Sequence, residues 1–333
     1  ILQGIGAGIA LQLMFNIVLQ QAPVGKLGVM MGFATLIIAI APAVGPSFGG
    51  FLVEAFGWRS IFLVLLPFLG LSLVLGALTV RQARDVEKVG FSPVQFLLVA
   101  AGFTALVVAV NAASESAWTS PKTLGLLALA FALLAGFTWI SRRSDTPLLR
   151  VRIFTDRTYS LSLAYAVLIQ AAVLALGYLI PYFAQVAKSV GSFAAGCLLL
   201  PGCIIGAILT PFGGRLLDRF GAKRPILAGA AVGVATLACF AAFGAEGSAV
   251  RLAFIYVFFP ICQGLSLSNS MTHGLRSLPE DLQADGNAAF NTVQQLGGAV
   301  GTAVAAAIVN SAQAGSSGDV VAGTTAGAQT AFY

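Results

Sequence analysis

Apolar residues run through this chain in long blocks that no charged residue interrupts. A helix rises about 1.5 Å per residue, so about 20 such residues cross the hydrocarbon core of a membrane. Apolar and polar positions do not alternate with the period of two that a membrane β-barrel needs. The pattern therefore predicts an all-α polytopic membrane protein with about ten transmembrane helices. Ten blocks of at least 19 residues lack Asp, Glu, Lys and Arg: 1–25, 27–53, 60–80, 89–114, 123–141, 158–187, 189–214, 225–245, 252–275 and 286–318.

Composition agrees with lipid as the solvent of this chain. Charged residues make up 9% of the 333 residues, against about 25% in a soluble domain. Hydrophobic residues reach 58%, which is more than the core of a soluble domain of this length requires. We therefore expect membrane lipid to surround most of the chain.

Positive charge is unevenly divided between the loops. Loops that follow the odd-numbered blocks hold 14 of the 18 cations. Because cytoplasmic loops carry the excess of Lys and Arg, these loops are predicted to face the cytoplasm of a multi-pass plasma (inner) membrane protein. This asymmetry also explains the pI near 9.4, so we expect no nucleic-acid partner. The odd-loop cations are Lys26, Arg81, Arg84, Lys88, Arg142, Arg143, Arg150, Arg152, Arg157, Arg215, Arg219, Lys223, Arg224 and Arg276.

The second block combines glycines and prolines that would break a helix in water. Neighbouring helices in a membrane can satisfy the freed carbonyls, and small residues allow backbones to approach closely. Gly32, Ala41, Gly45 and Gly49 fall near one helical face, where we expect another helix to pack. An ordinary kinked helix crossing is the alternative.

The same stretch resembles the antiporter motif of the major facilitator superfamily, Gly-x8-Gly-x3-Gly-Pro-x2-Gly-Gly. In that family the motif lies in the fifth helix and is associated with proton-driven export, which the resemblance implies here. Ala41 replaces the second glycine, a small change in size. The matching residues are Gly32, Gly45, Pro46, Gly49 and Gly50.

A second motif follows the seventh block. It resembles the superfamily's cytoplasmic loop Gly-x-Leu-x-Asp-Arg-x-Gly-x-Lys/Arg. Glycines permit a tight turn, and we expect Asp218 to pair with Arg219 or to cap a helix N-terminus. A plain basic cytoplasmic loop is the alternative. The matching residues are Gly214, Leu216, Asp218, Arg219, Gly221 and Lys223.

The resemblance also implies a division of the chain. The fourteen-helix drug:proton antiporter branch inserts two helices between two six-helix bundles. Residues 1–80 would then be helices four to six, 81–157 the inserted pair with its loops, and 158–333 helices nine to thirteen. On this reading the chain is a fragment without the first three helices and the last. The segment 311–330, rich in Gly, Ala, Ser and Thr, is expected to be an outer loop.

Uncharged polar residues inside the blocks are candidates for lining a central cavity. Bonding between helices explains each of them equally well. Gly297 and Gly301 are expected to mark a close helix crossing. The candidates are Gln12, Asn16, Gln170, Tyr178, Gln263, Asn269, Asn291 and Gln294.

Catalytic and metal-binding clusters are not recognisable in the sequence. The spacings of its four cysteines match no metal site, and His273 is the single histidine. We therefore predict no catalytic residues, no metal and no cofactor, with a proton gradient as the energy source. Buried free thiols are the expected state of the cysteines.

These observations favour an exporter of amphipathic drugs or toxic small molecules that works by proton antiport and alternating access. All 12 acidic residues lie in loops or at block ends, so the resemblance implies a proton-coupling acid in the earlier helices. The expected partners are a small amphipathic substrate, protons and membrane lipid, and we expect a monomer. The alternatives are a carrier for a sugar, amino acid or lipid, a polytopic membrane enzyme, and a non-transporting sensor.

Overall fold

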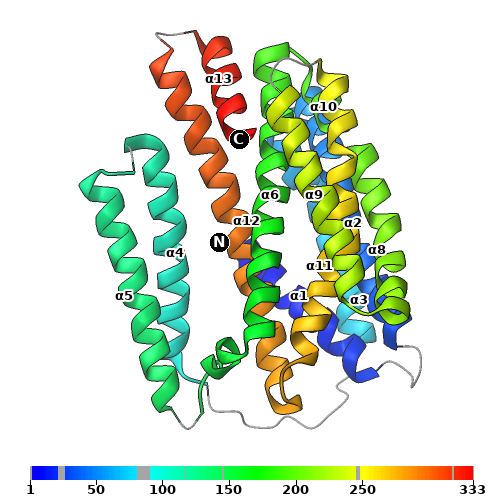
Figure 1. Ribbon diagram of the computed structural model, residues 1–333, viewed down its shortest axis with the longest axis vertical. Helices are drawn as coiled ribbons and strands as arrows, with labels where there is room; N and C mark the ends of the chain where they lie inside the picture. The colour runs from blue at the N-terminus through cyan, green and yellow to red at the C-terminus, as the bar shows by residue number, and fades with distance from the viewer. Residues whose placement is uncertain are drawn as a thin grey trace.

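The computed structural model describes residues 2–21, 27–80, 91–116, 118–144, 146–244, 248–316 and 319–332, and every regular element in them is a helix (Figure 1). The elements are α1 (Leu2–Gln21), α2 (Leu27–Phe56), α3 (Arg59–Thr79), α4 (Pro93–Ser116), α5 (Pro121–Arg143), the 3-10 helix η1 (Val151–Thr155), α6 (Arg157–Lys188), α7 (Ser192–Cys197), α8 (Leu200–Phe220), α9 (Lys223–Phe243), α10 (Ala249–Tyr256), α11 (Phe258–Arg276), α12 (Glu280–Gly315) and α13 (Val320–Phe332).

Each charge-free block coincides with a helix or with two consecutive helices. Among the described residues, eight helical segments are long and apolar enough to cross a membrane. They are α3, α4, α5, α6, α7 with α8, α9, α10 with α11, and α12. The helices α1 and α2, of 20 and 30 residues, cover the two remaining blocks. The predicted all-α membrane architecture is therefore confirmed.

Proline explains why two of the blocks form pairs of helices. A proline ring clashes with the carbonyl of the residue four positions earlier. Pro201 has this relation to Cys197, where α7 ends, and Pro260 has it to Tyr256, where α10 ends. Pro181 and Pro211, by contrast, lie inside continuous helices, which a membrane bundle tolerates.

Three groups of helices lie side by side (Figure 1). The C-terminal group, α6–α13, is built around α6 and α11, with α12 along α6 and with α8 and α9 along α11. The N-terminal group, α1–α3, contacts it where α2 packs against α7 and α8. The hairpin of α4 and α5 lies at the edge and packs against α12.

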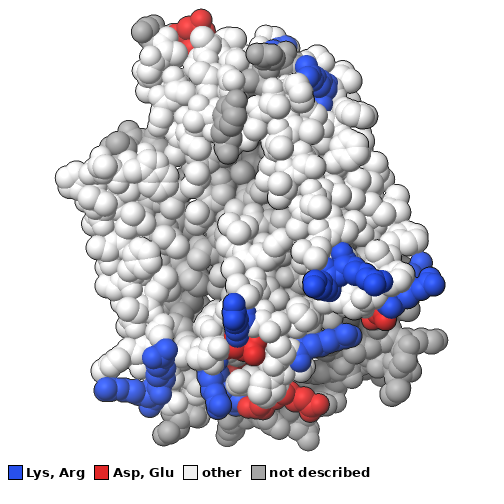
Figure 2. All heavy atoms as spheres, viewed as in Figure 1, with Lys and Arg blue, Asp and Glu red and all other residues white. Residues whose placement is uncertain are grey.

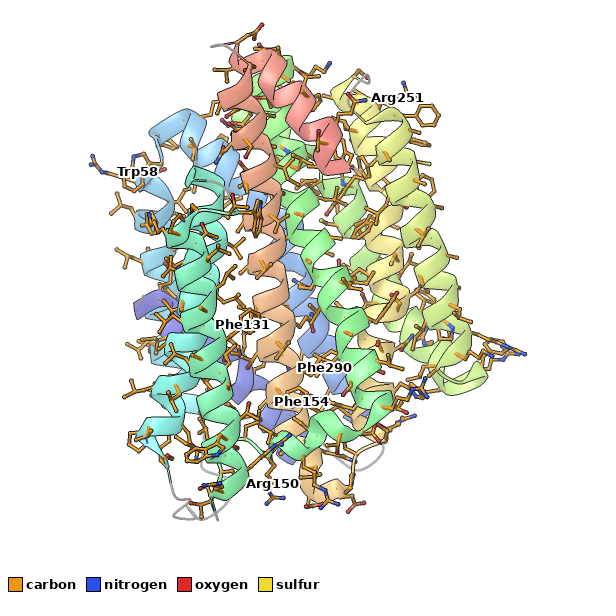
Figure 3. All side chains as sticks on the ribbon, turned by 60° about the vertical axis from the view of Figure 1, so that its left-hand side comes forward. Trp58, Phe131, Arg150, Phe154, Arg251 and Phe290 are labelled. Atoms are coloured by element: carbon orange, nitrogen blue, oxygen red, sulfur yellow. The ribbon has the colours of Figure 1, made fainter. Side chains whose placement is uncertain are left out.

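The outer surface is that of a protein immersed in lipid. Large apolar side chains are exposed along the helices, and α3 buries none of its residues. On the face that Figure 2 shows, Lys and Arg gather mostly at one end. That end holds Arg150, whereas Trp58 and Arg251 lie at the other (Figure 3). The distribution agrees with the orientation predicted from the loops, and we call these the cytoplasmic and outer ends.

Two apolar clusters hold the C-terminal group together. The outer cluster includes Phe183, Phe240 and Phe259, and the cytoplasmic cluster includes Tyr159 and Phe290. Between them α6 and α12 cross at close range. A Cβ atom at Gly297 would lie 2.7 Å from Val167 Cγ1, and one at Gly301 would overlap the carbonyl of Ala171. The predicted close crossing at Gly297 and Gly301 is confirmed.

The prediction of an outer loop at 311–330 is wrong. α12 continues to Gly315, and α13 begins at Val320 and packs against α12. Small residues make this contact possible, because a Cβ atom at Gly327 would lie 2.8 Å from the Cα atom of Val309. Thr324 adds a hydroxyl bond of 2.7 Å to the carbonyl of Val320, in its own helix. A composition typical of loops in water therefore forms a tightly packed helix here.

Candidate functional site

The contact between α2 and α7 is a place where two backbones touch. A Cβ atom at Gly50 would overlap the carbonyl of Ser192, and one at Gly196 would overlap the carbonyl of Pro46. Ser47, beside them, is buried and donates its hydroxyl to the carbonyl of Val44 at 3.0 Å. Two glycines, one from each helix, therefore allow the helices to meet without interdigitating side chains.

A carboxylate closes the outer edge of this contact. Glu54, near the end of α2, accepts a hydrogen bond of 3.0 Å from the backbone N–H of Phe193 in the first turn of α7. Backbone N–H groups in the first turn of a helix have no partner within the helix and favour negative charge. The rings of Phe51 and Phe193 meet edge to face at 6.1 Å beside this bond. We call the set of Pro46, Gly50, Glu54, Ser192 and Gly196 the outer contact.

The predicted antiporter motif only partly coincides with the outer contact. Pro46 and Gly50 take part in it. A Cβ atom at Gly45 or Gly49 would meet no other atom of the described residues within 4 Å, and Ala41 is exposed. In the part of the chain that the structure describes, the neighbouring stripe of α2 meets α7, and the packing face expected at these three positions stays a prediction. Gly32 lies in α2, but its surroundings are outside the described residues.

The cytoplasmic loop motif forms a tight turn between α8 and α9. Gly221 ends α8 with φ +74°, a conformation that favours glycine. The structure gives no ion pair or capping bond to Asp218 among the described residues, so neither expected contact is present. Arg219 and Arg224 instead lie over the ring of Phe220, at 5.3 and 5.4 Å from its centroid.

Of the two adjacent glycines at this end of α8, only one packs closely against another described helix. Within the described part of the chain, a Cβ atom at Gly214 would meet nothing within 4 Å, whereas one at its neighbour Gly213 would lie 2.5 Å from the carbonyl of Gly264 in α11. Leu216 is half-buried, and Lys223 begins α9. The close helix contact thus involves a glycine just outside the motif.

Four of the candidate cavity residues lie along α6 and α12. The amide of Gln294 donates to Oε1 of Gln170 at 3.1 Å, which joins the two helices between the two apolar clusters. Asn291 bonds within α12, to Asn287 at 3.0 Å. Tyr178 stacks on Tyr182 at 5.4 Å. All four candidates are half-buried.

The other candidates separate into two groups. Asn269 is 1% exposed and donates to the carbonyl of Gly213 at 2.9 Å, so it bridges α11 and α8, as the packing alternative requires. Gln263 is half-buried in α11. Gln12 and Asn16 lie on α1, but their side chains fall outside the described residues.

Several residues of the site escaped the sequence prediction. Glu54 and Ser192 stand at helix ends, where polar residues are common, and the bond from Phe193 to Glu54 spans 139 positions. Gly196 lacks a motif of its own. Its position one residue before the end of α7, which Pro201 follows, was the available signal, since such breaks bring backbone close to neighbours.

Metal and disulfide chemistry find no support in the described residues. They contain no group of three or more His, Cys, Asp and Glu side chains that could hold a metal ion. The four cysteines are free, with Cys262 buried, Cys197 and Cys203 half-buried and Cys239 exposed.

A sequence model described as "Major Facilitator Superfamily" matches residues 1–302. The chain belongs to the major facilitator superfamily. It is thus a multi-pass cell membrane protein of a transporter family. The motif in α2 resembles one that occurs in this same family.

Named relatives cover most of the chain. A lincomycin resistance protein of Listeria monocytogenes is 32% identical over all of this chain and 72% of its own length. Its namesake in Bacillus subtilis is 31% identical over 94% of the chain and 66% of its own length. The multidrug resistance protein Stp of Mycobacterium tuberculosis is 35% identical over 60% of the chain and 37% of its own length.

Proposed function

We propose that this transporter exports amphipathic drugs in exchange for protons by alternating access. The observation that carries the proposal is the outer contact, in which α2 of the N-terminal group meets α7 of the C-terminal group backbone to backbone. The names of the relatives support drugs as the substrate class.

The outer contact has the properties that a reversible closure needs. It depends on van der Waals contact of Gly50 with the backbone of Ser192 and of Gly196 with that of Pro46, and on one exposed hydrogen bond from Phe193 to Glu54. Both close approaches are made by backbone atoms, which favours separation of the two groups at this point. Rocking of two helix groups about a central site is the usual mechanism of transporters built this way.

Polar residues on α6 and α12 of the C-terminal group suit a substrate of mixed character. Gln170 and Gln294 offer amide donors and acceptors, and Tyr178 with Tyr182 offers stacked rings. Amides and rings bind amphipathic molecules through hydrogen bonds and apolar contact, without demanding a fixed charge.

The test is uptake into inverted membrane vesicles that contain the complete gene product. The vesicle lumen is acidified, and accumulation of ethidium and of lincomycin is followed with and without an uncoupler. We expect accumulation of at least one compound, abolished by the uncoupler, because inward proton flow would drive export. Accumulation that resists the uncoupler would contradict proton coupling. Absence of uptake of both compounds, with the protein in the membrane, would contradict the drug substrate.

A further inference from the structure

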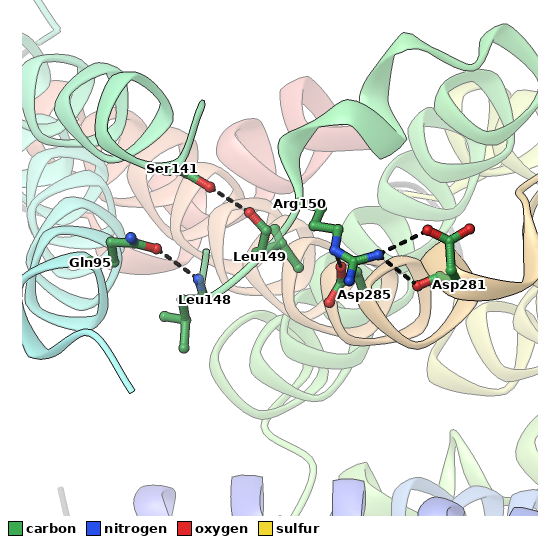
Figure 4. A network of polar contacts seen from close by, with 7 residues as sticks. All are labelled: Gln95, Ser141, Leu148, Leu149, Arg150, Asp281 and Asp285. Atoms are coloured by element: carbon green, nitrogen blue, oxygen red, sulfur yellow. Dashed lines mark hydrogen bonds and ion pairs between the residues drawn. The ribbon is translucent and has the colours of Figure 1, made fainter. Parts of the chain in front are cut away.

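Residues 146–156, which we call the strap, cross the cytoplasmic end between α5 and α6 (Figure 4). The first half of the strap is held by the hairpin. The side-chain oxygen of Gln95 in α4, which is 1% exposed, accepts a bond of 2.7 Å from the N–H of Leu148. The hydroxyl of Ser141 in α5 donates to the carbonyl of Leu149 at 2.5 Å.

The second half of the strap is held by α12. Arg150 Nη1 donates to Asp281 twice, to Oδ2 at 2.9 Å and to the backbone carbonyl at 3.2 Å. Its Nε lies 3.7 Å from Oδ2 of Asp285. One guanidinium therefore bridges two carboxylates one turn apart on α12. Ile153, three residues on, is fully buried in the cytoplasmic cluster with Phe290.

The end of the strap fixes the start of α6. Asp156 accepts a bond of 2.7 Å from the N–H of Tyr159 and another of 2.7 Å from the hydroxyl of Ser277, which follows α11. The bond from Tyr159, and then that from Ser277, lowers the pKa of Asp156. The strap is thus attached to α4, α5, α6, α12 and the end of α11.

The hairpin is joined to the C-terminal group by helix packing within the membrane as well as by the strap. The hairpin packs against α12, and in the described part of the chain no comparable packing joins α4 or α5 to α1, α2 or α3. The hairpin follows the N-terminal group in sequence but contacts the C-terminal group in space.

We infer that the α4–α5 hairpin moves with the C-terminal group as one body when the outer contact opens, and that Arg150 is a positioning residue that joins them. The inference rests on the proposed alternating access. Because the Arg150 and Asp281 side chains are about half exposed or more, their ion pair alone contributes little. The buried contacts of Gln95 and Ile153 also hold the strap in place. Loss of Arg150 therefore weakens the attachment of the hairpin to α12 without unfolding the hairpin.

Distances between spin labels in the complete gene product test the inference, with the native cysteines replaced by serine. The first distance, between Leu124→Cys and Asn310→Cys, measures the position of the hairpin relative to α12. The second distance, between Phe56→Cys and Lys188→Cys, measures the width of the outer contact. Gly196→Leu forces the outer contact open without any substrate. We expect the second distance to lengthen and the first to stay unchanged. A shift of the first distance that accompanies the second would overturn the inference.

The role of Arg150 is tested by a matched pair of variants. Arg152 lies two residues along the strap, is exposed, and has no ion pair among the described residues. We expect Arg150→Ala to raise the displaced population of the first distance about twofold to fivefold, the effect of one exposed pair, and Arg152→Ala to leave it unchanged. Equal effects, or none, would overturn the role of Arg150. The exchange Arg150→Asp with Asp281→Arg should restore the narrow distribution.

The two proposals fail in different ways. If the distance between positions 56 and 188 does not lengthen in Gly196→Leu, alternating access at the outer contact is contradicted. The comparison of Arg150→Ala with Arg152→Ala needs no opening, so it still decides whether Arg150 joins the hairpin to α12.

Discussion

Position 50 in α2 has no room for a side chain, because a Cβ atom there would overlap the carbonyl of Ser192. We therefore expect Gly50→Ala to disfavour the closed outer contact by about 1–3 kcal/mol, the usual effect of forced overpacking. The measurement is labelling of Cys197, next to the contact, by a membrane-impermeant maleimide, with the other three cysteines replaced by serine.

Gly49→Ala is the matched control for Gly50→Ala. It adds the same methyl group one residue earlier on the same helix, where a Cβ atom meets none of the residues that the structure describes within 4 Å. Faster labelling of Cys197 in Gly50→Ala alone is the expected result. Equal labelling of both variants would contradict the close contact at Gly50.

Glu54 tests whether the hydrogen bond at the outer edge stabilises closure. Gln can still accept the N–H of Phe193 but carries no charge, whereas Ala removes the acceptor. Because the bond is exposed, we expect Glu54→Ala to speed the labelling of Cys197 by about twofold to fivefold, with Glu54→Gln in between. The reverse order, or labelling that neither variant changes, would contradict this role.

The sequence indicated the helix that contacts α7, and the structure places that contact on the stripe next to the expected one. Residues 45 and 49 form one stripe of α2, and residues 46 and 50 form the next, about 100° away. Both stripes are small, so composition does not distinguish them. The backbone of α7, broken from α8 before Pro201, decides which stripe is covered.

Asn269 connects two helices, and its loss should weaken the C-terminal group. Its amide donates to Gly213 in α8 and to Leu265 in its own helix. We expect Asn269→Leu to lower the free energy of unfolding by about 0.6–1.7 kcal/mol, the range for polar bonds between membrane helices. Thermal unfolding in a mild detergent measures the effect.

Asn291→Leu is the control for the loss of a bond between two helices. The amide of Asn291 donates to Asn287, which lies in the same helix α12. A smaller loss of stability is expected for this variant. If it destabilises the protein as much as Asn269→Leu does, the bond between α8 and α11 is not the source of the effect.

Whole helices were predictable where a long run of the sequence contains no charged residue. Charge-free blocks locate every span because lipid excludes charge along the full length of a helix. α13 was missed because small and hydroxyl residues indicate a loop in water but close packing in a membrane. The strap was also unpredictable, since Arg150 and Asp281 lie 131 positions apart and neither has a local signal of pairing.

At the scale of the molecule, the three groups of helices move as two units if the α4–α5 hairpin moves together with α12. The N-terminal group then meets a single C-terminal body at the outer contact, and opening requires the separation of α2 from α7 and α8. Figure 1 shows this arrangement, with α2 behind α8 and α11 and with the hairpin at the far side of α12.

The most direct test of the account is to lock the outer contact and measure export. Phe51→Cys and Phe193→Cys, in the complete gene product without native cysteines, replace two rings 6.1 Å apart across the contact, and a short thiol-specific linker joins them. Phe254→Cys with Phe258→Cys, 5.7 Å apart within the C-terminal group, is the control pair. We predict that linking positions 51 and 193 stops uptake into inverted vesicles, that reduction of a cleavable linker restores it, and that the control link has no effect. Export that continues with positions 51 and 193 linked would contradict the account.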